Sequence, residues 1–177
     1  MTNGERGETV LHEILAAFSA VASNVELAKL REYDPKIGAL YTHFVTADAV
    51  EYHLRNALKA SGGPAPNSIK VSDIARDLSA FRVISVYYAL IYVVVEGYHE
   101  LGLVDEKVDH FLQDAEKVDS LRRFRNATFH FQKDPLSDKL MAHLSEDRYG
   151  DWTRDLARAL ESFFVRKLGL RELNLPD

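Results

Sequence analysis

The 177-residue sequence contains no cysteine, and this absence excludes a disulfide framework, a thiolate zinc site and a cysteine nucleophile. It also contains no P-loop, no dinucleotide-binding glycine fingerprint and no Gly-x-Ser-x-Gly elbow, so the enzyme classes marked by those motifs are not indicated. Internal repeats, low-complexity tracts and interdomain linkers are lacking too. The chain is therefore expected to form one domain over residues 1–177, large enough to bury a hydrophobic core.

Long hydrophobic runs are also scarce. Residues 1–8 are polar and do not resemble the apolar core of a signal peptide. The longest apolar run, residues 84–95, is interrupted by Ser85 and followed by Glu96, and we predict that it is too short to cross a bilayer. The expected protein is soluble and cytoplasmic, with no membrane contact.

Positive charge is in the minority overall but concentrated in one place. The net charge of −5 argues against a protein that coats nucleic acid without discrimination. Residues 117–133 nevertheless contain five Lys or Arg residues and only one Asp, a local balance of +4. A local site for an anion is compatible with this distribution.

What the sequence does contain is the periodicity of helices, because apolar residues recur at steps of three and four along most of the chain. We predict helices over residues 11–25, from Asp34-Pro35 to the loop at 61–67, from Ser72 or Asp73 to Leu101, over 105–112, over 116–133, from Asp134-Pro135 onward, and from Asp151 to Gly169. The third is apolar nearly all round, which is typical of a buried central helix. The predicted fold is an all-α bundle of about five to six helices.

The run RRFRNATFHFQK at residues 122–133 is unusual because it interleaves basic residues with phenylalanines. On a helix, the arc expected to face the core contains Leu121, Phe124, Ala127, Thr128 and Phe131. The opposite arc contains Arg122, Arg125, Asn126, Phe129, His130 and Lys133, with Arg123 at its edge. A phenylalanine and four cations without an acid are unfavourable on a solvated face, and contact with another protein surface and an anion would relieve both costs. The alternative is that Phe129 packs on a neighbouring helix and the cations are solvated.

The segment Arg125-Asn126-Ala127-Thr128-Phe129-His130 resembles the Arg-x4–6-His motif of HEPN (higher eukaryotes and prokaryotes nucleotide-binding) domains. In that family the residue after the arginine is typically small and polar, often Asn. HEPN domains are all-α bundles of about this size, with the motif on a late helix. The resemblance covers the helical layout of the whole chain and depends most sharply on three residues, Arg125, Asn126 and His130.

This resemblance implies a metal-independent endoribonuclease without a cofactor, in which the ribose 2′-hydroxyl attacks the adjacent phosphate. Such ribonucleases act as toxins or as defence or stress effectors. His130 would transfer protons, Arg125 would stabilise phosphate charge, and Asn126 would orient the imidazole or hold the phosphate. Candidates for binding neighbouring phosphates are Arg122, Arg123 and Lys133. Candidates for supporting the motif from the end of the central helix are Glu96, Tyr98 and His99.

The resemblance also implies partners. On a regular helix Arg125 and His130 would diverge by about 140°, so one copy is poorly arranged to grip a single atom. The family forms two-fold dimers in which both motifs face one cleft, and Phe129 would then lie in the dimer interface. HEPN toxins are often paired with a nucleotidyltransferase-like antitoxin, so the expected partners are RNA or nucleotide, a second copy and such an antitoxin.

Two other functions remain open. The first is a HEPN module that keeps the motif but only binds nucleotide, RNA or a protein partner. The second is a metal site in a helical bundle, because Glu96-Gly97-Tyr98-His99 has the Glu-x-x-His spacing of di-iron proteins. Such sites need a second Glu-x-x-His pair, which the sequence lacks, so no metal is expected.

Overall fold

The computed structural model describes residues 16, 34–60, 71–134, 138–146 and 150–170. The chain divides into two compact units, Met1–Gly38 and Ala39–Asp177. The helix predicted over residues 11–25 and the loop predicted at 61–67 lie outside the described residues. Most of the first unit lies outside them as well, so the single domain over 1–177 stays a prediction.

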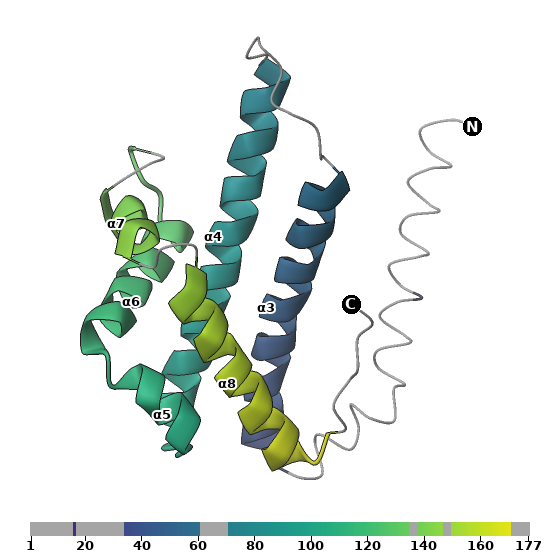
Figure 1. Ribbon diagram of the computed structural model, residues 1–177, viewed down its shortest axis with the longest axis vertical. Coiled ribbons are helices and arrows are strands. Elements are labelled where there is room, and N and C mark those ends of the chain that lie inside the picture. The colour runs from purple at the N-terminus through teal and green to yellow at the C-terminus, as the bar shows by residue number, and fades with distance from the viewer. Residues whose placement is uncertain (1–15, 17–33, 61–70, 135–137, 147–149, 171–177) are drawn as a thin grey trace. The chain divides into compact units, whose positions relative to one another are not determined.

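The described part of the chain is helical and contains no strand, which confirms the all-α prediction. Its helices are α3 (Pro35–Ala60), α4 (Val71–Glu100), α5 (Glu106–Leu112), α6 (Ala115–Phe129), α7 (Asp138–Glu146) and α8 (Asp151–Leu168) (Figure 1). The predicted boundaries of α4, α5 and α8 differ from these by one or two residues, as expected where helix ends fray.

Local capping residues explain several of these boundaries. The Asp34 carboxylate accepts hydrogen bonds from the backbone N–H groups of Lys36 at 2.9 Å and Ile37 at 3.2 Å, so it caps α3 as predicted. Asp105 caps α5 in the same way. At the end of α8, Gly169 has a φ of 60°, a left-handed conformation that glycine adopts without strain.

Helix α4 is central to the second unit and packs against α6 and α8, while α6 also packs against α7, and α5 against α8. Buried side chains on these helices form the core, and among them are Ile91, Val94, Val95, Leu121, Phe124, Leu156, Leu160 and Phe163. Helix α3 contacts α8 through Tyr41 and Phe44, whose rings lie 5.3 and 5.4 Å from that of Phe164. Gly97 lets Leu40 approach α4, because any Cβ at position 97 would collide with the Leu40 side chain.

Helix α7 is attached to α6 by a buried histidine. The His143 ring lies 5.1 Å from the ring of Phe124 and 5.3 Å from that of Tyr88. Its Nδ1 atom is 3.3 Å from the Ser120 hydroxyl oxygen. These contacts fix the face of α6 that is turned away from the solvent.

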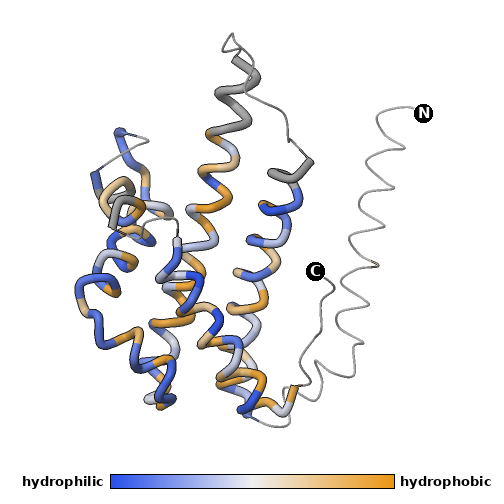
Figure 2. Tube along the Cα trace, in the orientation of Figure 1, coloured by the Kyte–Doolittle hydropathy of each residue, from blue (hydrophilic) through white to orange (hydrophobic). Residues whose placement is uncertain are grey.

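The hydrophobic character of α4 corrects one expectation. The 23-residue segment Leu78–Glu100 is long and apolar enough to cross a membrane, judged by length and composition only. The prediction that the apolar run is too short was based on residues 84–95 alone. Figure 2 shows hydrophobic residues recurring along this helix. Several of them, including Ile91, Val94 and Val95, are buried in the bundle. The cytoplasmic location stays a prediction.

The end of α6 corrects a second expectation. The helix ends at Phe129 rather than at Lys133, and His130 is extended, with φ −106° and ψ 146°. The predicted stop at Asp134-Pro135 is therefore wrong, and the next described helix begins at Asp138. Because the helical arc does not continue, Phe131 does not reach the core and is 92% exposed, although Leu121, Phe124 and Ala127 are buried as predicted.

Candidate active site

The centre of the candidate site is the Arg125 side chain on the last full turn of α6. Its Nη2 atom donates to both carboxylate oxygens of Glu96 on α4, at 2.7 and 2.6 Å. Its Nη1 atom donates to the Asn126 side-chain oxygen at 3.1 Å. The guanidinium carbon lies 5.2 Å from the centre of the Tyr92 ring, a cation–π contact. Two residues of α4, one helical turn apart, therefore fix the position of an arginine on α6.

The surroundings of Arg125 are partly shielded from water. Its side chain is 25% exposed and that of Glu96 is 42% exposed. The Arg125 Nε atom is buried and has no hydrogen-bond partner among the described residues. Burial raises the pKa of the Tyr92 hydroxyl, and the nearby Glu96 carboxylate raises it further. Tyr92 is thus a neutral aromatic surface under the guanidinium.

The other two motif residues follow at the end of α6. With its side-chain oxygen occupied by Arg125, Asn126 keeps its amide N–H groups as donors. The His130 side chain is exposed, and its backbone is held at both ends. Its N–H donates to the Asn126 carbonyl at 3.1 Å, and its carbonyl accepts from the Gln132 side chain at 3.1 Å. The motif is therefore assembled at the end of α6 and not along a continuous helix.

This placement of His130 removes one reason to expect a dimer. The divergence of about 140° between Arg125 and His130 assumed a regular helix through both residues. Since His130 is extended beyond the end of α6, that angle does not apply and no longer argues for a dimer. The dimer stays a prediction, and its remaining grounds are the resemblance and the exposed Phe129.

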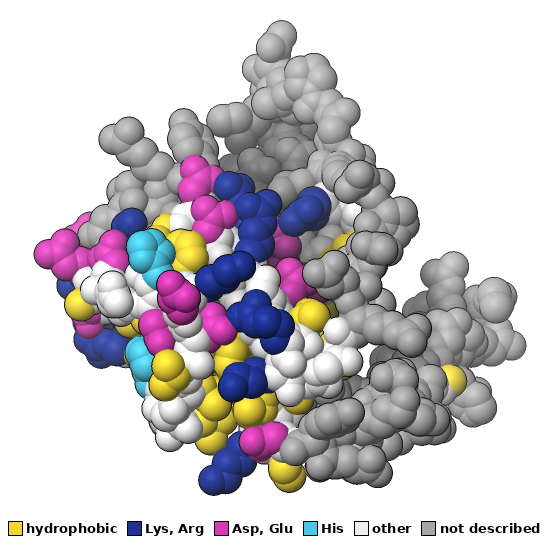
Figure 3. Space-filling model, turned by 60° about the horizontal axis from the view of Figure 1, so that its bottom comes forward, with side chains coloured by type: hydrophobic (Ala, Val, Ile, Leu, Met, Phe, Trp, Pro, Cys, Tyr) yellow, Lys and Arg dark blue, Asp and Glu magenta, His cyan; other side chains and the backbone are white. Residues whose placement is uncertain are grey.

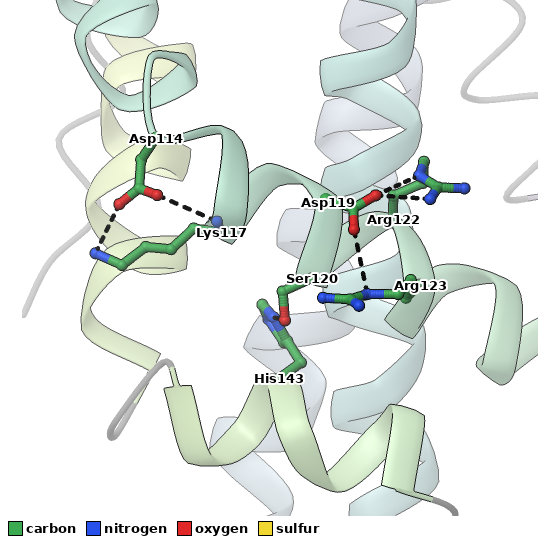
Figure 4. A network of polar contacts seen from close by, with 7 residues as sticks. All are labelled: Asp114, Lys117, Asp119, Ser120, Arg122, Arg123 and His143. Atoms are coloured by element: carbon green, nitrogen blue, oxygen red, sulfur yellow. Dashed lines mark hydrogen bonds and ion pairs between the residues drawn. The ribbon is translucent and has the colours of Figure 1, made fainter.

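The expectation of uncompensated cations beside the motif was wrong for its arginines. The Asp119 carboxylate accepts from Arg122 Nε at 2.9 Å and Arg122 Nη2 at 2.6 Å, and Arg123 Nε lies 3.3 Å from its second oxygen (Figure 4). The hydrogen bond and charge of Arg122 hold the pKa of Asp119 below its ordinary value. Lys133 is exposed. Figure 3 shows basic and acidic side chains intermingled on one face of the molecule.

Phe129 does not pack fully on a neighbouring helix, since its side chain is 54% exposed. Phe131 is more exposed still, so two apolar side chains flank His130 in the sequence. This argues against the alternative in which Phe129 is covered within the same chain. It leaves an apolar surface beside the candidate catalytic histidine.

Of the three residues predicted to support the motif, Glu96 contacts Arg125, whereas the other two have different surroundings. Tyr98 is buried, and its hydroxyl donates to Asp109 on α5 at 2.8 Å, so it belongs to the core. Burial and this hydrogen bond raise its pKa. His99 is exposed, with its ring 6.2 Å from that of Tyr98. Since Tyr98 is two residues from Glu96, it faces roughly the opposite side of α4.

Two contributors, Tyr92 and Asp119, were not predicted from the sequence. Tyr92 lies four residues before Glu96, and this spacing places both on one face of α4. Asp119 lies three and four residues before Arg122 and Arg123, the spacing of ion pairs within a helix. Both signals are present in the sequence.

Away from the motif, two features of the described residues are the lack of a metal-binding group and a hollow between α5 and α8. The described residues contain no group of three or more His, Cys, Asp or Glu side chains arranged to hold a metal ion. The hollow, of about 660 Å³, is lined by polar side chains that include Lys107, His110 and Arg158, together with the apolar Phe111 and Ala159, and by none of the motif residues.

Comparisons of the chain with protein-family models, curated proteins and solved structures found no match.

Proposed function

We propose that the chain is a metal-independent endoribonuclease of HEPN type, with Arg125, Asn126 and His130 as its catalytic residues. The observation that carries the proposal is the way Arg125 is held at the end of α6, by Glu96, Asn126 and Tyr92 together. An arginine fixed before substrate arrives is what phosphate-charge stabilisation requires, because no side-chain ordering is then needed in the transition state.

The proposed reaction is transesterification at one phosphodiester. The 2′-oxygen bonds to phosphorus, and His130 of one copy takes the proton of the 2′-hydroxyl. The bond between phosphorus and the 5′-oxygen breaks, and the partner subunit's His130 gives a proton to that oxygen. The products are a 2′,3′-cyclic phosphate and a 5′-hydroxyl. Arg125 stabilises the charge on the non-bridging phosphate oxygens, and Asn126 donates an N–H to the phosphate or the imidazole.

The proposed active form is a symmetric homodimer in which the ends of two α6 helices meet. The exposed Phe129 supplies apolar surface for that contact, and it lies next to His130 in the sequence. A shared cleft would collect two copies of the motif around one phosphate. The expected location is the cytoplasm, where RNA and a nucleotidyltransferase-like antitoxin are accessible partners.

The test is incubation of the purified protein with RNA in the presence of EDTA. We expect cleavage that yields 2′,3′-cyclic phosphate ends and that falls by at least about a hundredfold in His130→Ala. His110→Ala is the matched control, because His110 is also exposed but lies on α5, and it should cleave normally. Sedimentation should show a dimer. A dependence on divalent metal, equal activity of His130→Ala, or a strict monomer would overturn the proposal.

The second candidate function is a HEPN module that binds RNA or nucleotide without cutting it. The observation that favours it is the occupation of Arg125 Nη2 by Glu96, which reduces the donors available to a phosphate. This function predicts RNA binding that depends on Arg125, with no cleavage of structured or single-stranded RNA at any protein concentration.

A further inference from the structure

The contact between Glu96 and Arg125 is made through a single nitrogen. Both carboxylate oxygens lie within hydrogen-bond distance of Nη2, at 2.7 and 2.6 Å. Nη1 is engaged by Asn126. The third nitrogen, Nε, is buried and has no hydrogen-bond partner among the described residues. The way Glu96 binds thus determines which donors Arg125 has left.

A guanidinium grips a phosphate with two parallel hydrogen bonds from neighbouring nitrogens. One pair is Nη1 with Nη2, and the other is Nε with Nη2. Both pairs include Nη2, and both oxygens of the Glu96 carboxylate already lie within 2.7 Å of that nitrogen. Nη2 carries two N–H groups, but a phosphate on the same nitrogen would lie close to the Glu96 carboxylate and be repelled by its charge. The Glu96 contact therefore opposes a two-bond grip of Arg125 on a phosphate.

From this geometry we infer that Glu96 is an internal competitor of the phosphate at Arg125, and that a phosphate binds by displacing the Glu96 carboxylate from Nη2. The inference rests on the proposed function and states how the same site is regulated. The state without phosphate is then a closed one, in which a carboxylate takes the place of the substrate anion.

Two further observations agree with an exchange of this kind. Glu96 is 42% exposed, so its carboxylate has room to turn into water. Arg125 keeps two other contacts when Glu96 leaves, the Tyr92 ring and the Asn126 oxygen, and therefore stays in place. An anion that binds Nη2 together with Nε also gives a partner to a buried donor that the Glu96 contact leaves unused.

The exchange has a measurable consequence. A site that must first release an internal anion binds an external one more weakly. Its apparent affinity equals the affinity of the open state multiplied by the fraction of molecules in that state. Glu96→Gln keeps the size of the side chain but removes its charge, so its hold on Arg125 is weaker. We expect phosphate ligands to bind Glu96→Gln about tenfold more tightly than the wild-type protein.

The probe is a short 2′-O-methyl RNA, which cannot be cleaved by 2′-hydroxyl attack, and binding is measured by fluorescence anisotropy at fixed ionic strength. Asp155→Asn is the matched control, because it removes one negative charge from an exposed ion pair with Arg158 on α8 and leaves the motif and its neighbouring arginines untouched. It should change affinity less than about twofold. Adding Arg125→Gln to Glu96→Gln should abolish the gain. Glu96→Asp, whose shorter side chain withdraws from Nη2, is a second variant in case Glu96→Gln is poorly folded.

Equal or weaker binding by both Glu96 variants, or an equal gain in Asp155→Asn, would overturn the inference and leave Glu96 as a structural support only. Titration with inorganic phosphate, followed through the Arg125 Nε–H resonance, separates the two proposals. A gain for phosphate in Glu96→Gln with no RNA cleavage by the wild-type protein supports the inference and rejects the ribonuclease. Cleavage without any gain does the reverse.

Discussion

Arg122 and Arg125 lie almost one turn apart on the same helix and each is bound to a carboxylate, but the two ion pairs have different origins. The partner of Arg122 is Asp119, three residues earlier on α6, and both side chains are nearly half exposed. The partner of Arg125 is Glu96, which comes from α4, 29 residues away. The first pair requires only a helix, whereas the second requires the folded bundle.

The difference shows why one basic side chain in this run is a better candidate for function than its neighbours. An exposed pair within a helix contributes little to stability and is easily exchanged for water. Arg125 is partly buried, lies against an aromatic ring and has three partners. Side chains that are fixed from several directions are those that act in binding and catalysis with little ordering cost.

The largest expected difference between the two ion pairs appears when Arg125 and Arg122 are changed, one at a time, to lysine. Lysine keeps the positive charge but loses the planar fork, so it cannot bind Asn126 and at the same time hold a phosphate by two parallel hydrogen bonds. We expect Arg125→Lys to lower RNA cleavage by at least about a hundredfold, as removal of a transition-state donor does. Arg122→Lys should change it by less than about threefold.

The measurement is kcat/KM on one RNA, with circular dichroism to show that both variants are folded. If Arg122→Lys were as damaging as Arg125→Lys, the two sites would be equivalent and the comparison would fail.

A smaller effect is expected from the ring under Arg125. Tyr92→Leu removes the cation–π contact that helps to hold Arg125 in place. We expect kcat to fall about tenfold, because a misplaced arginine stabilises the phosphate charge less well. Tyr92→Phe keeps the ring and should retain most of the activity. Because Tyr92 is buried, thermal unfolding of both variants is the control. Equal losses in the two variants would indicate that the hydroxyl, rather than the ring, positions Arg125.

The third effect concerns stability. Glu96→Ala leaves the partly buried Arg125 without its carboxylate, and we expect the free energy of unfolding to fall by about 1–2 kcal/mol. Asp119→Ala should cause no measurable change, because its partners are exposed and become hydrated. Urea unfolding of both variants makes this comparison. A larger loss for Asp119→Ala would show that the local pair, and not the pair between helices, supports the bundle.

The contrast between contacts within one helix and contacts between helices also explains which features could be predicted from the sequence. The starts of α3 and α5 and the end of α8 depend on residues within one turn, namely Asp34, Asp105 and Gly169. Such local signals are visible in a sequence. The spacing of Arg125, Asn126 and His130 is local as well, so the sequence is sufficient to single out these three residues as a candidate site.

The end of α6 was predicted wrongly because nothing local marks it. No glycine or proline stands near Phe129, and Asp134-Pro135 was the nearest stop signal. After Ala127 the segment presents no further buried apolar side chain to α4 or α7, so packing stops supporting the helix. Thr128, whose hydroxyl bonds to the Phe124 carbonyl at 3.0 Å, and the aromatic residues that follow are weak helix formers.

The contact of Glu96 with Arg125 could not be derived from spacing, because it depends on how α4 and α6 cross. From the sequence, Glu96 was only one of three candidates at the end of the central helix. The structure distinguishes it from Tyr98 and His99 by the face of α4 on which it lies. Only the packing of two helices supplies that information.

The smallest expected effect tests the local pair by itself. Arg122 lowers the pKa of Asp119, so a carboxyl ¹³C titration of Asp119 should have its midpoint below the ordinary carboxyl value. A lowered pKa means that the contribution of the pair to stability, which is small because the pair is exposed, is present above the pKa of the unfolded chain and is lost as the pH falls through the folded pKa. Arg122→Gln should move the midpoint upward, and so should about 1 M salt, because the substitution removes the attraction and the salt screens it.

Arg158→Gln, which breaks a similar exposed pair on α8, is the control and should leave the midpoint of Asp119 unchanged. A midpoint that resists both Arg122→Gln and salt would mean that Asp119 is held by something other than its helical neighbours, and the distinction between a local and a tertiary pair would then have to be abandoned for this surface.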